Sequence, residues 1–204
     1  MFPLRVTDVK INIKSKRLIG PINLEIEQNG ISILLGANGS GKTTLLEALH
    51  GLRKLSAGKV EWNISNSQAA AEQAFVFQSP IMLRRTVAEN LAFPLKVRRL
   101  SKLTTTTEVM MWAKKIGLED KIKQQAMLLS GGEMQAIAVA RALITKPKML
   151  FLDEPTASLD GATKKAIEDI LISASSNGTK ILMSTHDIGQ LKRLAKDIIF
   201  LNNG

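Results

Sequence analysis

The stretch that most constrains the fold is a glycine-rich loop, Gly36-Ala37-Asn38-Gly39-Ser40-Gly41-Lys42-Thr43. The apolar run Ile31–Leu35 precedes it, and the helix-like segment Thr44–Leu49 follows. Strand, loop and helix in this order are the context in which G-x-x-x-x-G-K-[ST] predicts a phosphate site. The alternative is an ordinary glycine-rich turn, which the flanking segments disfavour. We therefore expect an α/β fold that binds a nucleoside triphosphate through the loop and the adjacent Thr44.

Each residue type in the loop has a chemical reason. Glycines let backbone N–H groups point inward, and the helix N-terminus adds the positive end of a dipole. Lys42 is placed to reach the β- and γ-phosphates, and the hydroxyl of Thr43 is placed to bind Mg²⁺. The pattern thus predicts Lys42 as a catalytic and binding residue and Thr43 as a metal ligand.

The chain is basic, but its net charge alone does not identify a partner. Lys and Arg number 28 against 18 Asp and Glu, a formal net charge of +10, which favours polyanionic partners. Aromatic residues make up only 4% of the chain, so a stacking surface for single-stranded nucleic acid is poorly supplied. We expect a solvated basic surface and no nucleic-acid partner. No apolar run approaches the ~20 residues of a membrane helix, and neither cysteine nor a secretory signal is present, which favours the cytoplasm.

Hydrophobic periodicity predicts strands before the loop and alternating helices and strands near the end of the chain. Apolar residues alternate with polar ones over residues 4–13 and 22–26, and Gln28-Asn29-Gly30 predicts a hairpin turn into the loop's strand. Further strands are predicted at Lys59–Trp62, Ala74–Phe77, Met149–Leu152, Ile181–Met183 and Ile198–Leu201. Helices are predicted at Glu133–Ile144, Ala162–Ser175 and Ile188–Ala195. Strands that are apolar throughout indicate a sheet covered on both faces.

The middle of the chain differs in character. Residues 80–132 carry two prolines and apolar residues at helical intervals, which predicts an inserted helical lobe. We expect a single domain, 1–204, with a core formed by 1–79 and 133–204. Thr104–Thr107 are interpreted as a helix N-cap region rather than a phosphorylation cluster, and Met110–Trp112 as lobe packing. His50, at a helix end, is interpreted as a structural residue whose cation or dipole suits a helix C-terminus.

Two carboxylates follow the apolar strand Met149–Leu152. In an open parallel sheet the carboxyl ends of the strands form the ligand-binding edge. Asp153 is suited to hold Mg²⁺, and Glu154 to orient and deprotonate the water that attacks the γ-phosphate. A solvated acidic pair is the alternative, which an upstream phosphate loop disfavours.

A second helix start suited to anions lies at Leu129-Ser130-Gly131-Gly132-Glu133. By itself it is an N-cap followed by turn glycines. Because one domain already has its phosphate loop, a second such helix end is most useful if it faces a nucleotide held by another copy of the chain.

Over essentially its whole length the chain resembles the nucleotide-binding subunits of ATP-binding cassette (ABC) transporters. Six motifs carry the resemblance in order: Walker A (36–43), the Q-loop Gln78, the signature (129–133), Walker B with its catalytic glutamate (149–154), the D-loop Ser158-Leu159-Asp160, and the switch histidine His186. A helical insertion separates the second motif from the third.

The resemblance implies a P-loop NTPase core of the RecA type, with an N-terminal antiparallel β-region, and ATP and Mg²⁺ as cofactors. It implies a head-to-tail homodimer in which Ser130, Gly131 and Gly132 bind the γ-phosphate of the partner's ATP. Gln78 would reach Mg²⁺ and His186 would hold the γ-phosphate and attacking water as a catalytic residue. Asp160 joins the candidate nucleotide-binding residues.

Transport partners follow from the same resemblance. An integral-membrane permease would dock between Gln78 and the helical lobe, at Ile81-Met82-Leu83-Arg84-Arg85, although a solvated lobe surface explains that stretch equally well. The segments around Gln78 and His186 are most similar to bacterial importers of small anions, such as tungstate, or of amino acids. This implies a solute-binding protein and a position on the inner face of the cell membrane. The alternatives are a soluble ABC ATPase acting on nucleic acid or the ribosome, and another P-loop enzyme.

One departure from the family concerns the contact with adenine. The family stacks adenine on an aromatic residue before Walker A, but no Phe, Tyr or Trp lies between Pro3 and Gly36. We expect weaker or less base-selective nucleotide binding, with an aliphatic or cationic side chain near Ile13–Arg17 as the substitute.

Overall fold

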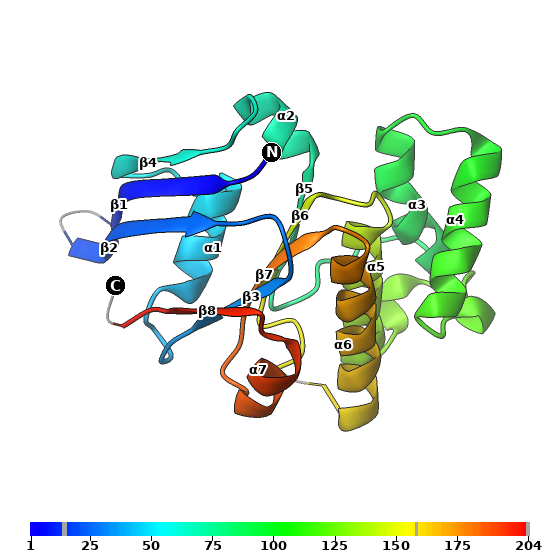
Figure 1. The fold of residues 1–204 in the computed structure, drawn as a ribbon. Coiled ribbons are helices and arrows are strands. Elements are labelled where there is room, and N and C mark those ends of the chain that lie inside the picture. The colour runs from blue at the N-terminus through cyan, green and yellow to red at the C-terminus, as the bar shows by residue number, and fades with distance from the viewer. Residues whose placement is uncertain (14–15, 158, 203–204) are drawn as a thin grey trace.

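The computed structural model describes residues 1–13, 16–157 and 159–202, and side chains at 13, 16 and 17 are not described. Two sheets and a group of helices make up the fold (Figure 1). An antiparallel sheet has the order β2 (Lys16–Ile26), β1 (Leu4–Ile13), β4 (Ala57–Glu61). A parallel sheet has the order β5 (Gln73–Val76), β6 (Met149–Asp153), β7 (Lys180–Ser184), β3 (Ile31–Leu35), β8 (Asp197–Phe200). The predicted α/β class with an N-terminal antiparallel β-region is confirmed.

The helices fall into two groups along the chain. Those of the first and last parts are α1 (Lys42–His50), α2 (Asn66–Ala71), α5 (Gly131–Leu143), α6 (Gly161–Ser176) and α7 (Ile188–Leu194). Between β5 and α5 lie α3 (Val87–Val97), α4 (Lys102–Lys115) and two 3-10 turns, Glu119–Lys121 and Ala126–Leu128. In Figure 1, α3 and α4 stand at the end of the molecule opposite the antiparallel sheet. The chain therefore carries an inserted helical segment, while its division into core 1–79 and 133–204 and lobe 80–132 stays a prediction.

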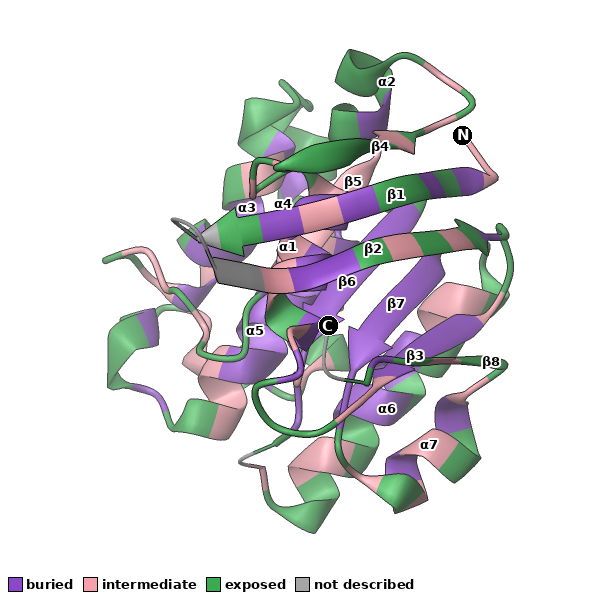
Figure 2. Cartoon of the chain, turned by 90° about the vertical axis from the view of Figure 1, so that its left-hand side faces the viewer, coloured by how far each residue is buried: buried purple, intermediate pink, exposed green. Residues whose placement is uncertain are grey.

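Strand β6 shows why the parallel sheet needs cover on both faces. All five of its residues are buried. Met149 and Phe151 pack into a core shared with α1 and the antiparallel sheet, while Leu150 and Leu152 pack into a second core with α3, α4, α5 and α6. Alternate side chains of a strand point to opposite faces, so a continuous apolar run is satisfied only in such a sandwich. Figure 2 shows the buried strands of this sheet behind the more exposed antiparallel one.

The turn at Gln28–Gly30 is not a hairpin, contrary to the sequence-based prediction. β2 pairs antiparallel with β1, whereas β3 lies in the other sheet, parallel to β7 and β8. The first four residues of β3 are buried. A strand apolar on both faces is stabilised inside the parallel sheet rather than at the half-exposed edge of the antiparallel one.

For two helices the structure differs from the sequence-based prediction: the start of α4 was misplaced, and α2 was not predicted at all. The N-cap of α4 is Ser101, whose Oγ accepts the N–H of Thr104 at 3.1 Å, so Thr104–Thr107 lie inside the helix rather than at its cap. Trp112 is buried as predicted, but Met110 and Met111 are about half exposed. Helix α2 was not predicted, although Ser65 and Gln68 form a capping box at its start.

His50 is structural, but not as a cation. Its ring packs edge-on against Phe75 and Phe151, at centroid distances of 5.5 and 5.6 Å. Burial lowers the pKa of His50, because the charged imidazolium is poorly solvated there. The neutral ring therefore acts as a packing group at the end of α1.

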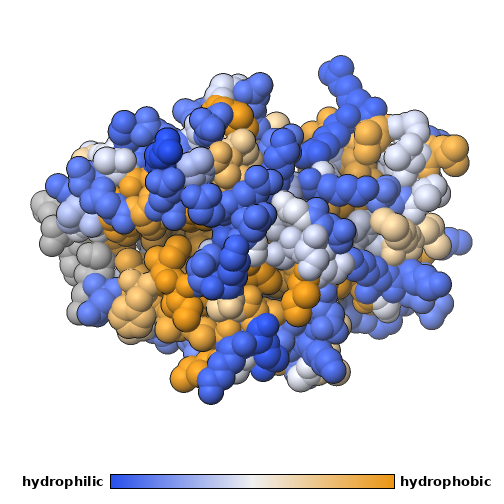
Figure 3. Space-filling model, viewed as in Figure 1, coloured by the Kyte–Doolittle hydropathy of each residue, from blue (hydrophilic) through white to orange (hydrophobic). Residues whose placement is uncertain are grey.

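The surface is mixed in polarity. Figure 3 shows hydrophilic side chains over much of this face and apolar ones gathered around β2, β3 and β8. Ile198 and Phe200 of β8 are 52% and 67% exposed. Within the described ranges, the helices are all too short or too polar to cross a membrane.

Candidate active site

The glycine-rich loop ends where α1 begins, and two of its glycines adopt left-handed backbone angles. φ is 80° at Gly39 and 98° at Gly41, a region that other residues enter at a cost. At Gly41 a Cβ would also lie only 2.2 Å from Cγ2 of the buried Ile19. Gly41 is therefore required for its backbone angle and for the space it leaves.

Lys42 is the first residue of α1 and is only 6% exposed. Its Nζ donates to the carbonyl oxygens of Gly36 at 3.0 Å and Ala37 at 3.2 Å. These contacts fold the ammonium group back over the loop. A cation this deeply buried interacts with an anion more strongly than one in bulk water, because the surroundings screen it less.

Asp153 lies at the carboxyl end of β6, where hydroxyl groups from two other elements meet it. Oγ1 of Thr43 donates to its Oδ2 at 2.7 Å, and Oγ of Ser184 donates to its Oδ1 at 2.7 Å. The carboxylate is 4% exposed, so both oxygens are satisfied inside the protein.

Ser184 is a residue to which the sequence reasoning gave no role. It is fully buried at the end of β7, in register with Asp153, and its Oγ also accepts the N–H of Glu154 at 2.9 Å. Ser184 therefore joins the end of β7 to the end of β6, through Asp153 and Glu154. Its place as the last residue of a buried strand, two before the switch histidine, is the signal that could have found it.

The donors around Asp153 suit Mg²⁺. Mg²⁺ is bound in proteins by one or two carboxylate or hydroxyl oxygens, together with substrate phosphates and water. Thr43 Oγ1 and Asp153 Oδ2 are hard oxygen donors in direct contact beside the phosphate loop. Among the described residues no group of three His, Cys, Asp or Glu is placed to hold a metal.

Three side chains from separate segments converge on Glu154. Nδ1 of His186 lies 3.2 Å from Oε2, and Nζ of Lys42 lies 3.8 Å from Oε1. Nε2 of Gln78, which follows β5, donates to Oε2 at 3.5 Å. The Glu154 side chain is 13% exposed, whereas that of His186 is 57% exposed. The carboxylate thus lies in a recess with polar groups on several sides.

The backbone at Glu154 is strained. Its φ is 42°, a left-handed angle that costs a residue with a side chain about 1–3 kcal/mol in unfavourable cases. The hydrogen bond from its N–H to Ser184 helps to hold this conformation. Such strain is common where a side chain must be aimed at a site.

These residues surround one cavity of about 480 Å³. Its lining residues are Asn38, Gly39, Gly41, Lys42, Thr43, Thr44, Gln78, Glu154, Ala157 and His186. The structure therefore brings together the loop, Gln78, the strand-end carboxylate and the histidine, which the sequence separates widely. A cavity of this size lies in the range of small-ligand sites.

The signature residues do not line that cavity. Ser130 is the N-cap of α5, and its Oγ donates to Oε2 of Glu133 at 2.9 Å while accepting the N–H of Glu133 at 3.3 Å. The ammonium of Lys121 beside Glu133, followed by the N–H of Ser130, lowers the pKa of that carboxyl group. Gly131 lines a smaller neighbouring cavity of about 210 Å³ with Gln78 and Glu154. Roles of Ser130, Gly131 and Gly132 toward a nucleotide stay predictions.

Asp160 caps a helix in this chain, and its role toward a nucleotide stays a prediction. It is the N-cap of α6, and its Oδ1 accepts the N–H groups of Ala162 at 3.0 Å and Thr163 at 2.9 Å. Hydrogen bonds from Thr163, from the backbone first and then the side chain, lower the pKa of Asp160. Ser158 of the predicted D-loop lies outside the described residues, as do the side chains near 13–17 that were expected to replace the adenine-stacking aromatic.

Comparison with known proteins identifies the family. The sequence pattern of the ABC transporter family matches residues 19–157. The tungstate uptake system ATP-binding protein TupC of Peptoclostridium acidaminophilum is 36% identical, over 98% of this chain and 95% of that protein. The phosphate import ATP-binding protein PstB of Campylobacter jejuni is 34% identical, over 98% of this chain and 87% of that protein.

Solved structures agree. The ATP-binding subunit of an ABC transporter, 20% identical, shares the fold with a TM-score of 0.89, over all of this chain and 87% of that one. The cbiO1 protein of Clostridium perfringens, part of the ABC transporter complex cbiONQ, is 26% identical with a TM-score of 0.86, over all of this chain and 86% of that one. The chain, with its P-loop NTPase fold, therefore belongs to the ABC transporter family and is one of its ATP-binding subunits, which are ATPases.

Proposed function

We propose that the chain is the ATP-hydrolysing subunit of a bacterial importer for a small oxoanion such as tungstate. The observation that carries the catalytic part is the meeting of Lys42, Gln78 and His186 at Glu154, beside the Thr43–Asp153 pair. The relative from a tungstate uptake system supports the solute. Others come from arginine and taurine transport systems at 33% and 32% identity, so import is better supported than the choice of solute.

In the proposed mechanism the loop binds the triphosphate of ATP, and Lys42 exchanges its carbonyl contacts for phosphate oxygens. Thr43 and Asp153 would hold Mg²⁺, which supplies positive charge to the phosphates when bound, and Gln78 reaches the same region. Glu154 orients the attacking water and accepts its proton. His186, beside Glu154, binds the γ-phosphate and holds the water in line. Positioning and electrostatics supply most of the rate enhancement.

The second half of each site comes from a twin chain in this proposal. Ser130, Gly131 and Gly132 lie at the start of α5 and outside the main cavity, so they are available to a nucleotide held by a partner. The start of a helix with free N–H groups binds phosphate favourably. ATP would thus join two chains head to tail, and hydrolysis would release them.

The absence of cysteine makes this arrangement testable by crosslinking. We expect Asn38→Cys combined with Ser130→Cys to form a disulfide-linked dimer when ATP is added, in a Glu154→Gln background that cannot hydrolyse it. The two single-cysteine variants are the controls, and neither should form the disulfide-linked dimer when ATP is added. A bond formed within one chain, or a dimer equally abundant without nucleotide, would contradict the head-to-tail arrangement.

A groove beside the helical segment suits the permease. It has a volume of about 370 Å³ and is lined by Phe77, Ile81, Phe93 and Arg141, among others. Phe77, Ile81 and Phe93 are 37%, 63% and 42% exposed. Of the stretch predicted for docking, Arg84 and Arg85 are exposed, while Met82 packs against the core. A groove of this kind accepts the apolar face of a short helix. This partner would hold the chain on the inner face of the cell membrane, with a solute-binding protein in the same system.

The transport role is tested by measuring ATPase activity of the chain in membrane vesicles with its permease. We expect stimulation by tungstate bound to the system's binding protein, and weaker stimulation by phosphate or taurine. Stimulation by RNA or DNA instead, with none from the permease, would favour a soluble ABC ATPase. A larger effect of phosphate than of tungstate would contradict the choice of tungstate as solute but leave the transport role in place.

A further inference from the structure

A buried polar network lies behind the candidate active site, centred on Gln190 of α7. This side chain has no solvent exposure. Its Nε2 donates to Oγ1 of Thr156 at 2.9 Å and to Oε1 of Glu168 at 3.1 Å. Thr156 and Glu168 are themselves 5% and 4% exposed. Three polar groups from three segments therefore meet away from water.

Glu168, on α6, is the charged member of the network. Arg193 of α7 donates to both of its oxygens, from Nε to Oε2 at 2.8 Å and from a terminal nitrogen to Oε1 at 2.7 Å. The guanidinium of Arg193 is the main cause that lowers the pKa of Glu168. The carboxylate thus stays ionised and accepts from Gln190 with a fixed orientation, because a forked ion pair restricts both partners.

The network connects the segments that carry the two candidate catalytic groups. Thr156 lies two residues after Glu154, and α7 begins two residues after His186. Asp187 caps α7 by accepting the N–H of Gln190 at 2.9 Å, and it forms an ion pair with Lys164 of α6. The segment of His186 is therefore attached to α6 at Glu168 and Lys164, and the segment of Glu154 is attached to α7 through Thr156.

We propose that Gln190 and Glu168 are positioning residues that set His186 against Glu154. The inference rests on the proposed roles of those two groups in hydrolysis. Neither Gln190 nor Glu168 lines the cavity of the candidate active site, so each acts through the segment to which it is attached. Within the described part of the chain, Oε1 of Gln190 is buried and has no hydrogen-bond partner. Because its amide contacts Thr156 and Glu168 while its N–H contacts Asp187, a change at Gln190 acts on both segments at once.

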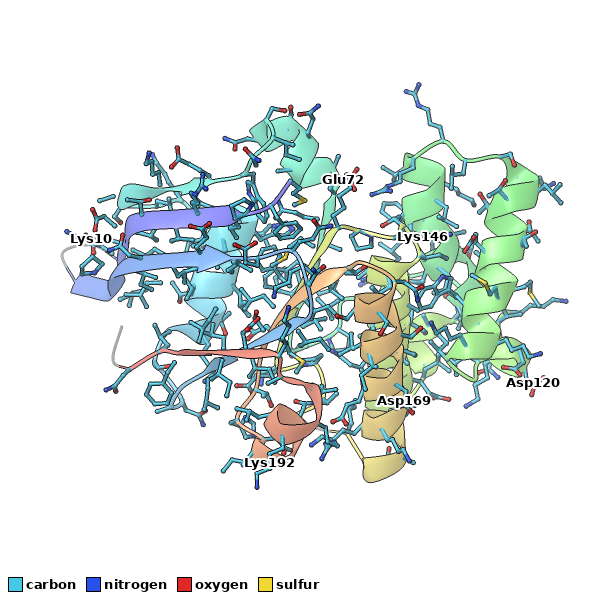
Figure 4. The ribbon with its side chains drawn as sticks, viewed as in Figure 1. Lys10, Glu72, Asp120, Lys146, Asp169 and Lys192 are labelled. Atoms are coloured by element: carbon cyan, nitrogen blue, oxygen red, sulfur yellow. The ribbon has the colours of Figure 1, made fainter. Side chains whose placement is uncertain are left out.

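The first test is the kinetics of Gln190→Leu, which puts an apolar side chain of similar size in place of the amide and so removes the donor. We expect kcat to fall at least ~10-fold while KM for ATP stays within about twofold, because a displacement near 1 Å can cost ~100-fold in rate. Two matched controls should keep kcat. Thr179→Val loses a buried hydrogen bond of 2.9 Å to the carbonyl of Pro147, away from the site, and Lys192→Ala changes an exposed residue of α7 that points away from the molecule in Figure 4.

The second test reads the geometry directly. The chain contains only two histidines, His50 and His186, so their ring resonances are easily assigned by NMR. We expect Gln190→Leu to shift the ring signals of His186 and leave those of His50 in place. We also expect Gln190→Glu to be slower than Gln190→Leu, because two carboxylates would then face each other, and Gln190→Glu with Glu168→Gln to recover part of the rate.

Unchanged kcat in Gln190→Leu, a parallel loss in Thr179→Val, or unmoved His186 signals would each overturn the proposal. Glu154→Gln and Lys42→Ala are measured beside them. If those two variants hydrolyse ATP normally, the proposed function fails. If they are inactive while Gln190→Leu is fully active, only the positioning role fails.

Discussion

Nδ1 of His186 lies 3.2 Å from Oε2 of Glu154, although the two residues follow different strands, β6 and β7. Adjacent strands of a parallel sheet end at the same edge, so groups just beyond them meet there. The contact places Glu154, the candidate base, beside His186, which would hold the γ-phosphate and the attacking water. The catalytic predictions follow from this arrangement.

Glu154→Gln should bind ATP and barely hydrolyse it. The amide keeps the shape of the side chain but cannot accept the proton of the attacking water, so turnover should fall at least ~100-fold. Steady-state ATPase assays and binding of a fluorescent ATP analogue measure the two effects. Normal turnover would remove Glu154 from its role as base.

Lys42→Ala should weaken ATP binding itself. The triphosphate loses a buried cation that now lies 3.0 and 3.2 Å from two loop carbonyls. Equilibrium binding of ATP measures the change, and Lys54→Ala, on the chain just beyond α1, is the control. Equal affinities of Lys42→Ala and the unchanged protein would contradict the phosphate role of the loop.

Ser184→Ala should lower the free energy of unfolding and the rate of ATP hydrolysis. The change removes partners from Oδ1 of Asp153 and from the N–H of Glu154, and leaving buried polar groups unpaired costs about 1–3 kcal/mol. Urea unfolding gives the free energy. Ser32→Ala, on β3, loses only a 3.5 Å contact with Asp197 and should cost less; an equal or larger cost there would be inconsistent with the bridging role of Ser184.

Gly41→Ala should be more destabilising than Gly39→Ala. Both residues have positive φ, so alanine strains each backbone by a similar amount, about 1 kcal/mol. Only at Gly41 does the added Cβ meet an atom, Cγ2 of Ile19 at 2.2 Å, whereas nothing lies within 4 Å at Gly39. Thermal unfolding without nucleotide compares the pair, and equal Tm values would contradict the steric account.

The Asp187 carboxylate should make stability depend on pH in acid. Its hydrogen bond with the ammonium of Lys164 is the main cause that lowers its pKa from 3.8 to about 2. A depressed pKa stabilises the fold above the unfolded value and ceases to do so as pH falls through the folded one. The stability difference between the unchanged protein and Asp187→Asn should therefore be largest above pH 3.8 and decline as the pH falls through about 2.

Urea unfolding over this pH range checks the prediction. Asp169→Asn, which changes an exposed carboxylate of α6 labelled in Figure 4, is the control. A difference for Asp187→Asn that stays constant down to pH 2 would show that the ion pair with Lys164 is not its source.

Much of this architecture could be predicted from the sequence, for physical reasons. The loop at 36–43 and the apolar strand ending at Asp153 carry their local conformation in residue type, and both were predicted close to their observed bounds. The pairing of β2 was not, because the turn at Gln28–Gly30 looks the same whether it joins strands within a sheet or between sheets. Ser184 was missed because a buried hydroxyl gains its meaning from a neighbouring strand distant in sequence. The network around Gln190 likewise depends on the packing of α6 and α7.

The cap of α5 has a consequence for any anion that approaches it. A serine hydroxyl owns a single proton, and that of Ser130 points to Glu133. To donate to a phosphate, the hydroxyl must turn away from its own carboxylate, which then relies on Lys121 and the backbone N–H of Ser130. A phosphate at this helix end therefore competes with the Glu133 carboxylate for the hydroxyl proton of Ser130. The hydroxyl donates to the phosphate only if that hydrogen bond is the stronger of the two.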